Sequence, residues 1–396
     1  MTGQLTETAA WPATRPPADF TLSHVRVVLA DRVVDDGTIV VRDGLIAEIL
    51  ERPSRCDLDG QGLLVMPGLI DIHSDALEKE RAPRPTAVLP WDFTLTSFEQ
   101  KLAALGITTM FHGAGFQHKH ARGVRREPTM ALDLCREVVA HRRHAVDHRI
   151  LHRLDVLSEP GADALRTWLA ERPDNGVPPL VSHEDHTPGQ GQYVDPQHLV
   201  NYIVGVDGST TEEAWRRVEE MRQEGTDFAH IRQENLTWLG ELASSGQIRL
   251  MGHDPDTPEA IDELVERGAV VAEFPTTMDA ARRARERGLL IAAGAPNVLR
   301  GRSHAGNVSA GELARAGCLD AVASDYLPSG MLGAVSVLAP ELGLPRAVGL
   351  VTSGPARVAG LADRGVLAEG ERADLVLVDD HCGPWLRVAT MLGAAG

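Results

Sequence analysis

The sequence is poor in positive charge and very poor in lysine. Its 396 residues contain 39 Lys and Arg against 56 Asp and Glu, which gives a formal net charge of −17. Proteins that bind nucleic acid through its backbone need positive charge to displace the phosphate counterions, so this composition excludes a generic nucleic-acid binder. Lysine occurs only at positions 79, 101 and 119. Arginine must therefore supply most of the cations in any phosphate-binding site.

Cysteine and long apolar runs are also scarce. The four cysteines lie far apart without a CxxC pair, so neither a thiolate zinc site nor a disulfide framework is indicated. Histidine and carboxylate side chains must carry any metal chemistry. The chain shows neither the charged and apolar start of a signal peptide nor an apolar run long enough to span a bilayer. We expect a soluble cytoplasmic protein without a membrane partner.

The two ends of the chain differ in pattern from its middle. Residues 1–20 contain three prolines and no helical or strand period, which predicts a flexible leader. Short β-branched segments between 22 and 50 resemble another segment near 370–380. We predict a leader over 1–20, a small β domain composed of 21–62 and 364–396, and one main domain over 63–363.

The middle of the chain alternates strand-like runs with amphipathic helical stretches, as a parallel α/β fold requires. The predicted strands are 63–73, 106–113, 149–156, 179–186, 248–254, 269–275, 289–296 and 319–325. Eight such repeats favour a TIM (β/α)8 barrel over an open sheet. The stretch 187–247 is too long for one crossover, and we expect two helices within it, near 211–225 and 231–244, that cover the mouth of the barrel.

Several strand-like runs end in histidine or carboxylate residues. His73 and Asp75 close the first run, and because residues two apart in a strand share a face, both can bind one ion. The alternative is a capping aspartate beside a surface histidine. Further strand ends carry His186, His253 with Asp254, and Asp325. Such side chains at the carboxyl mouth of a barrel are typical of a hydrolytic site for Zn, Mn or Fe.

Longer motifs place the sequence in a known family. They are VMPGLIDIHSDALEK (65–79), PRP (83–85), GITTMF (106–111), DHTPGQGQ (185–192), GHDPDT (252–257), AEFPTT (272–277), GAPNVLRGRSHAGN (294–307) and SDYLPSG (324–330). With these motifs the chain resembles the amidohydrolase superfamily of metal-dependent barrel hydrolases. Within it, the chain is most similar to the α-D-ribose 1-methylphosphonate 5-triphosphate diphosphatase family of the carbon-phosphorus lyase pathway of phosphonate degradation.

The resemblance implies a centre with one or two divalent metal ions. Its expected ligands are His73, Asp75, Asp155, His186, His253 and Asp325. It also implies that Asp325 is the catalytic general base; the alternative is that Asp325 is only a ligand. Many relatives bridge two ions with a carboxylated lysine, which this chain excludes because it has no lysine beyond 119. Asp155 is the first candidate for the replacement and Glu184 the second.

Two places depart from the pattern of the family. The third strand of relatives typically ends in HxRxE, where this chain has Leu151, Arg153 and Asp155, with His152 one step out of phase. The fourth strand carries His183 and Glu184, where relatives usually have apolar residues. These departures leave the exact ligand set open.

The implied reaction is attack of water, activated by a divalent ion, on phosphorus of the ribosyl 5-triphosphate, which leaves the 5-phosphate and releases diphosphate. The loop after the seventh strand offers phosphate donors, and such loops commonly bind phosphate in barrels. The expected phosphate-binding residues are Asn297, Arg300, Ser303, His304 and Asn307, together with Lys79 and Arg84 beyond the first strand. The alternatives are a Gly-rich loop that caps a helix and a solvated loop. Glu273 and the pair Thr276–Thr277 are further candidates to orient a ligand.

Two other functions stay open at this point. One is an amidohydrolase that acts on a cyclic amide, an N-acyl group or an amine. The other is a non-catalytic component of a phosphonate-degrading assembly, which the departures at Leu151 and Asp155 would favour. The expected partners are a phosphorylated ribose substrate and other proteins of the phosphonate pathway, with a homo-oligomer as a further possibility.

Overall fold

Eight parallel strands form the central barrel of the protein. The computed structural model describes residues 18–84, 86–121, 124–141, 145–302 and 306–393. The strands of the barrel, in spatial order, are β6 (Leu69–Ser74), β7 (Ile107–Phe116), β10 (Asp147–Asp155), β11 (Leu180–Glu184), β12 (Arg249–His253), β13 (Val271–Glu273), β14 (Leu290–Gly294) and β15 (Ala321–Ala323). A parallel bridge between Ser74 and Asp325 joins the first strand to the last. The expected (β/α)8 barrel is confirmed.

Helices surround the barrel. They are α1 (Ala76–Arg81), α2 (Trp91–Ala104), α3 (Pro128–Ala140), α4 (Glu159–Glu171), α8 (Pro258–Glu266), α9 (Met278–Glu286), α10 (Ala295–Arg300), α11 (Ala310–Arg315), α12 (Gly330–Leu342), α13 (Leu344–Gly349) and α14 (Ser353–Ala359). Threonines of two motifs begin two of these helices, because the Thr257 and Thr277 hydroxyls accept the backbone N–H of Ala260 and Ala280. The short strands β8 (Lys119–Ala121) and β9 (Val124–Arg126) form a separate pair after β7.

The first predicted strand is divided in two. Gly68 separates β5 (Leu64–Pro67) from β6, and a Cβ atom there would lie 2.2 Å from the Thr108 side chain. The Gly68 backbone N–H donates to the carbonyl of Asp374 over 2.8 Å. The chain therefore passes at this glycine from the terminal sheet into the barrel, with no room for a side chain.

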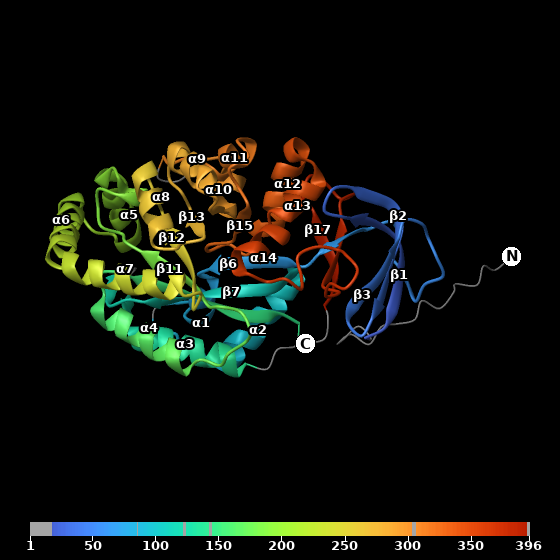
Figure 1. Ribbon diagram of the computed structural model, residues 1–396, viewed down its shortest axis with the longest axis horizontal. Coiled ribbons are helices and arrows are strands. Elements are labelled where there is room, and N and C mark those ends of the chain that lie inside the picture. The colour runs from blue at the N-terminus through green and yellow to red at the C-terminus, as the bar shows by residue number, and fades with distance from the viewer. Residues whose placement is uncertain (1–17, 85, 122–123, 142–144, 303–305, 394–396) are drawn as a thin grey trace.

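Residues from both ends of the chain build the terminal sheet. Its strands are β1 (Phe20–Val28), β2 (Val33–Arg42), β3 (Leu45–Leu50), β4 (Leu58–Asp59), β5, β16 (Leu375–Asp379) and β17 (Arg387–Leu392). The sheet has its own apolar core around Leu22, Ile39 and Leu375. Figure 1 shows it at one end of the molecule, with blue strands beside red ones. The domain boundaries given above stay a prediction, and the predicted leader lies largely outside the described residues.

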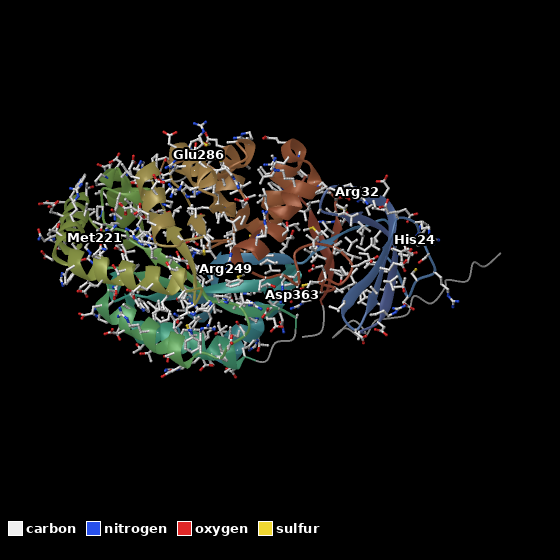
Figure 2. All side chains as sticks on the ribbon, in the orientation of Figure 1. His24, Arg32, Met221, Arg249, Glu286 and Asp363 are labelled. Carbon is white, nitrogen blue, oxygen red and sulfur yellow. The ribbon has the colours of Figure 1, made fainter. Side chains whose placement is uncertain are left out.

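The amino end of the barrel is closed by α14. Ala356, Val358 and Ala359 of this helix pack with interior residues such as Ile72 and Ala321. Arg249, at the start of β12, donates to the carbonyls of Arg357 and Val358, each over 2.9 Å (Figure 2). This plug leaves the opposite, carboxyl end of the strands for a site.

The long insertion between β11 and β12 contains three helices, one more than expected. After the short 3-10 turn η1 (Gly191–Tyr193) come α5 (Pro196–Asp207), α6 (Thr211–Asp227) and α7 (Ala229–Ser244). The helix not foreseen is α5, which packs with α6 in a small separate core. These helices lie at the end of the molecule opposite the terminal sheet, where Met221 marks α6 (Figures 1 and 2). None of the helices in the described ranges is long and apolar enough to cross a membrane, and the cytoplasmic location stays a prediction.

Candidate metal centre

Three strands end in residues with unusual backbone conformations. Asp254, Phe274 and Asp325 follow β12, β13 and β15 and have φ values of 52°, 55° and 58°. Each of them donates its backbone N–H to a neighbouring strand end, with acceptors Glu273, Ala292 and His73 at 2.8 to 2.9 Å. Non-glycine residues adopt this left-handed region rarely, and such strain gathers at functional sites. The strand ends are thus held in positions that aim their side chains at the mouth.

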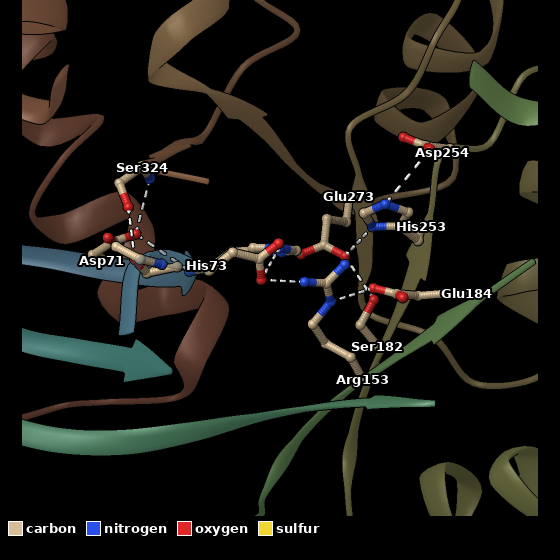
Figure 3. Close-up of polar contacts among 12 residues, drawn as sticks. Asp71, His73, Arg153, Ser182, Glu184, His253, Asp254, Glu273 and Ser324 are labelled. Carbon is tan, nitrogen blue, oxygen red and sulfur yellow. Dashed lines mark hydrogen bonds and ion pairs between the residues drawn. The ribbon is translucent and has the colours of Figure 1, made fainter. Parts of the chain in front are cut away.

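Glu273 joins two histidines at the centre of the mouth. Its Oε1 atom lies 2.6 Å from Nδ1 of His73, and its Oε2 atom lies 2.8 Å from Nδ1 of His253. Ser182 donates its hydroxyl to Oε2 over 2.6 Å, and the carboxylate is fully buried (Figure 3). Because a carboxylate can only accept, both histidines donate from Nδ1, so their Nε2 atoms are the ones left to bind an ion.

Two groups of potential metal ligands lie on either side of Glu273. One contains His73, Asp75 and Asp325, and the other contains His186, His253 and Asp254. The ligand atoms within each group lie within 4.8 Å of one another. The His73 and His253 rings are 5.9 Å apart between centroids. The structure therefore brings five of the six predicted ligands together and adds Asp254 to them.

Arg153 lies between two carboxylates of this site. Its Nη1 atom contacts Asp75, and its Nε atom donates to Oε1 of Glu184 over 2.5 Å (Figure 3). Burial opposes the charged form of Glu184, but Arg153, His253 and His186 nevertheless hold the pKa of Glu184 below its usual value. Both carboxylates are thus ionised and face a shared region of the mouth.

Asp155 makes a local hydrogen bond at the end of β10. Its Oδ1 atom accepts the backbone N–H of Leu157 over 3.2 Å in the turn after β10. It belongs to none of the ligand groups found among the described residues. Glu184, its register partner on β11, is in contact with Arg153 instead. Of the two candidate bridging carboxylates, only Glu184 is linked to the other site residues by the contacts above.

His152 and His183, at the two places where the sequence departs from the family pattern, face away from the mouth. His152 accepts the indole N–H of Trp168 over 2.9 Å and stacks on Phe116, which places it under the helical layer. Leu151 packs in the barrel interior instead. Burial lowers the pKa of His183 to about 4, and its Nε2 atom is buried without a partner among the described residues. Neither His152 nor His183 joins the ligand groups.

The pKa values of two carboxyl groups in the mouth are raised. Burial is the main cause for both: it raises the pKa of Asp254 to about 6 and that of Asp325 above its usual value, although His253 and His73 respectively oppose this. The Oδ2 atom of Asp254 is buried without a hydrogen-bond partner among the described residues. This oxygen lies 3.5 Å from Nε2 of His253, and a carboxylate oxygen that faces an imidazole nitrogen at this distance fits a shared cation.

Predicted phosphate-binding residues lie in two places. Arg300 and Asn307 line a pocket of about 830 Å³ after β14, together with Arg302, Glu312 and Arg315. Asn297 accepts a hydrogen bond from Arg300 over 2.7 Å. Ser303 and His304 lie outside the described residues. Lys79 and Arg84 are exposed, and Lys79 lies over the ring of Tyr326 at 5.5 Å from its centroid.

The sequence did not predict one polar residue of the site, and another residue has a role other than the predicted one. Asp71 accepts the backbone N–H groups of Ser324 and His73, over 2.9 and 3.3 Å, and so fixes the seam where the barrel closes. Its position two residues before His73 was the available signal. Thr277, a candidate to orient a ligand, instead caps α9 and donates to the carbonyl of Asp256.

One curated relative matches nearly the whole chain. The α-D-ribose 1-methylphosphonate 5-triphosphate diphosphatase of Escherichia coli strain K12 is 34% identical over 370 residues, which are 91% of this chain and 96% of that enzyme. The chain belongs to this diphosphatase family. The resemblance carried by the sequence motifs is thereby confirmed. No protein-family model matches the chain.

Solved structures show the same fold as this member of the diphosphatase family. An amidohydrolase shares 17% identity at a TM-score of 0.57, over 93% of both chains. A prolidase complexed with N-methylphosphonate-L-proline shares 17% identity at a TM-score of 0.58, over 95% of this chain and 98% of its own. The dihydropyrimidinase of Brevibacillus agri shares 13% identity at a TM-score of 0.57, over 96% and 94%. These identities establish the fold alone.

Proposed function

We propose that the protein hydrolyses α-D-ribose 1-methylphosphonate 5-triphosphate to the 5-phosphate and diphosphate. The match to the Escherichia coli enzyme, which covers nearly the full length of both chains, carries this proposal. The mouth of the barrel supports it, because it gathers histidines and carboxylates suited to a hydrolytic metal centre. The arginine-lined pocket after β14 supports a substrate with several phosphates.

The two ligand groups would each hold one divalent ion, with Zn, Mn and Fe as the candidates. His73, Asp75 and Asp325 would hold one, and His186, His253 and Asp254 the other. Imidazole and carboxylate ligands suit these metals. When bound, such ions supply activation of water and neutralisation of phosphate charge. Glu273 directs both Nε2 atoms towards the ligand groups by accepting from the two Nδ1 atoms.

Glu184 is our candidate for the carboxylate that takes the place of the carboxylated lysine of relatives. It contacts Arg153, which also contacts Asp75 of the first ligand group. His253 and His186 of the second group lower its pKa together with Arg153, so it is ionised and close to both groups.

Asp325 is our candidate for the general base. The bridge to Ser74 and the hydrogen bond from its own N–H to the His73 carbonyl fix its backbone at the seam of the barrel. Burial raises its pKa, which moves the carboxylate towards the range where it can accept a proton from water near neutral pH. The proton of the attacking water would pass to its carboxylate and then to the product.

The cationic pocket after β14 would receive the terminal phosphates of the substrate. Arg300, Arg302 and Arg315 line it, and Asn307 adds an amide. Hydrogen bonds between guanidinium groups and phosphate oxygens are charge-assisted, which favours this pocket for the leaving diphosphate.

Phosphorus NMR of the metal-loaded protein with the ribosyl triphosphate tests the proposal, with ATP as the comparison substrate. We expect one diphosphate for each ribosyl 5-phosphate formed. Orthophosphate as the only inorganic product, or full metal occupancy without turnover, would overturn the proposal. Asparagine keeps a side-chain oxygen for the ion but cannot take a proton from water, so the variant Asp325→Asn should keep bound metal and lose turnover.

A further inference from the structure

A second cluster of histidines and a carboxylate lies outside the barrel mouth. Glu99 comes from α2, His112 from β7, His141 from the end of α3, and His148 from the start of β10. The side chains of Glu99 and His148 are 6% and 0% exposed, and that of His141 is 9% exposed. The cluster lies between the strands and the outer helices, and none of the proposed catalytic steps uses it.

Three atoms of this cluster converge on one point. The Nε2 atom of His141 lies 3.0 Å and the Nε2 atom of His148 lies 3.7 Å from Oε2 of Glu99. All three ligand atoms lie within 4.8 Å of one another. Two atoms bound at about 2.1 Å to a tetrahedral ion lie about 3.4 Å apart, so these separations suit one zinc-sized ion.

The Nε2 atom of His148 provides an independent sign of a missing ligand. It is buried and has no hydrogen-bond partner among the described residues. Its distance from Glu99 is too long for a hydrogen bond, yet the atom is aimed at that carboxylate. A buried polar atom left in this way destabilises the fold, and a bound cation would offset that cost.

His112 orients the ring of His148. Its Nε2 atom lies 2.8 Å from Nδ1 of His148, and the two rings are stacked at 15°. Burial, with the nearby His148 and His141, keeps the pKa of His112 well below its usual value, so its ring is neutral and can accept. In the metal-bound form His112 would accept from Nδ1 of His148, so that Nε2 of His148 faces the ion, as in other metal-bound histidines.

Glu99 is ionised in this setting. Burial opposes its charge, but His148, His141 and the backbone N–H of Ala145 hold its pKa at about 2. The Ala145 N–H donates to Oε1 over 2.5 Å, and Oε2 accepts a hydrogen bond from Nε2 of His141 over 3.0 Å. The cluster therefore places one negative charge beside two imidazole Nε2 atoms at a buried point, and the proton that His141 Nε2 donates to Glu99 would leave to solvent when an ion binds.

We propose that Glu99, His141 and His148 form a second metal site, separate from the catalytic centre, that binds a divalent transition ion such as Zn²⁺. Two imidazoles and one carboxylate are a common ligand set for this ion, and a water molecule would complete its coordination. The ion would tie together α2, the end of α3 and the start of β10. The site is thus structural.

Metal content and cobalt spectroscopy of the full-length protein test this proposal. The variant His73→Ala/His253→Ala removes one histidine from each ligand group of the barrel mouth, and we expect it to retain one tightly bound Zn²⁺ per chain. Adding His141→Ala should remove that ion. The matched control His24→Ala alters an exposed histidine of the terminal sheet. It should not change the metal content of the barrel-deficient protein.

The variant His141→Cys guards against loss of folding, because cysteine can still bind the ion. We expect its Co²⁺ form, in the barrel-deficient background, to gain a near-ultraviolet thiolate-to-cobalt absorption band. A barrel-deficient protein that binds no tight ion, or a Co²⁺-loaded His141→Cys variant without this band, would overturn the proposal. The cluster would then be a hydrogen-bonded network of histidines and Glu99 without metal.

Discussion

The Oε1 atom of Glu273 lies 2.6 Å from Nδ1 of His73, although the two residues are 200 positions apart in the chain. The other oxygen of the same carboxylate binds His253. One fully buried carboxylate therefore sets the tautomer of both central histidines. The first and second ligand groups are connected through this residue.

The Glu273→Gln variant should lose metal affinity. The amide can accept from only one histidine, so at least one ring loses its fixed tautomer. Losses of this kind are about 10–100-fold in metal affinity. Competition with a chelator, followed by metal analysis, measures the change. The matched control Glu286→Gln alters an exposed carboxylate on α9 and should leave affinity unchanged; equal affinity in both variants would refute this role.

The Arg153→Met variant should destabilise the metal-free protein. It would leave Asp75 and Glu184 buried beside each other without the cation that contacts both. Removing one partner of a buried ion pair costs about 3–5 kcal/mol. Saturating Zn²⁺ or Mn²⁺ should recover most of the loss, because the ion supplies the missing positive charge.

Thermal unfolding with and without metal measures the effect of Arg153→Met. The control Arg216→Met alters a largely exposed arginine of α6, and the expected cost is below about 1 kcal/mol. A loss of stability that is the same in both metal states would contradict the prediction.

His152 should make stability depend on pH. Burial lowers its pKa to about 4, and its ring is neutral because Nε2 accepts from Trp168 while Nδ1 donates to the Leu180 carbonyl. The unfolded chain binds this proton below about pH 6.5, whereas the folded chain does not, so stability is lost as pH falls through that range. The expected loss from this group is about 2 kcal/mol between about pH 7.5 and pH 5.

The variant His152→Gln tests the pH dependence, since glutamine can make both hydrogen bonds without titrating. Denaturant unfolding at the two pH values should show a smaller loss than in the unmodified protein. The control His24→Gln alters an exposed histidine and should leave the loss unchanged. An unchanged loss in His152→Gln would show that other groups dominate the acid sensitivity.

The Arg302→Met variant should weaken binding of the triphosphate. Arg302 lines the cationic pocket after β14, where its guanidinium would contact the leaving diphosphate. Loss of one charge-assisted contact of about 1.5–3 kcal/mol corresponds to a rise in KM of about tenfold or more. Steady-state kinetics measures this change. The control Arg282→Met alters an exposed arginine on α9, and equal KM values in both variants would exclude the pocket.

Much of the fold could be predicted because hydrophobic periodicity is local. Each of the eight predicted strands overlaps a strand of the barrel, and the motif residues His73, His253 and Asp325 do lie at strand ends. The helix α5 was missed within the insertion. The break at Gly68 was missed too, because it depends on the close approach of Thr108, a contact that no local pattern reveals.

For the candidate site, the sequence likewise predicted the types of residue but not the contacts among them. The residue types and their spacing predicted histidine and carboxylate ligands, and the motifs indicated the family that the curated relative confirms. Asp155 and Glu184 were ranked by resemblance alone, and both occupy the same register position on neighbouring strands. The contacts of Arg153 distinguish them, since its guanidinium reaches Glu184 and Asp75.

The sequence by itself determined the barrel and the ends of its strands, because the period of apolar residues is a local property of the chain. It also determined the chemical nature of the site, because the scarcity of lysine and cysteine leaves histidine and carboxylate side chains as the ligands. Only the tertiary structure decided which carboxylate orients which histidine. It also brought Glu99, His141 and His148 to one point. Such contacts join residues far apart in the chain, and their geometry depends on packing of the whole barrel.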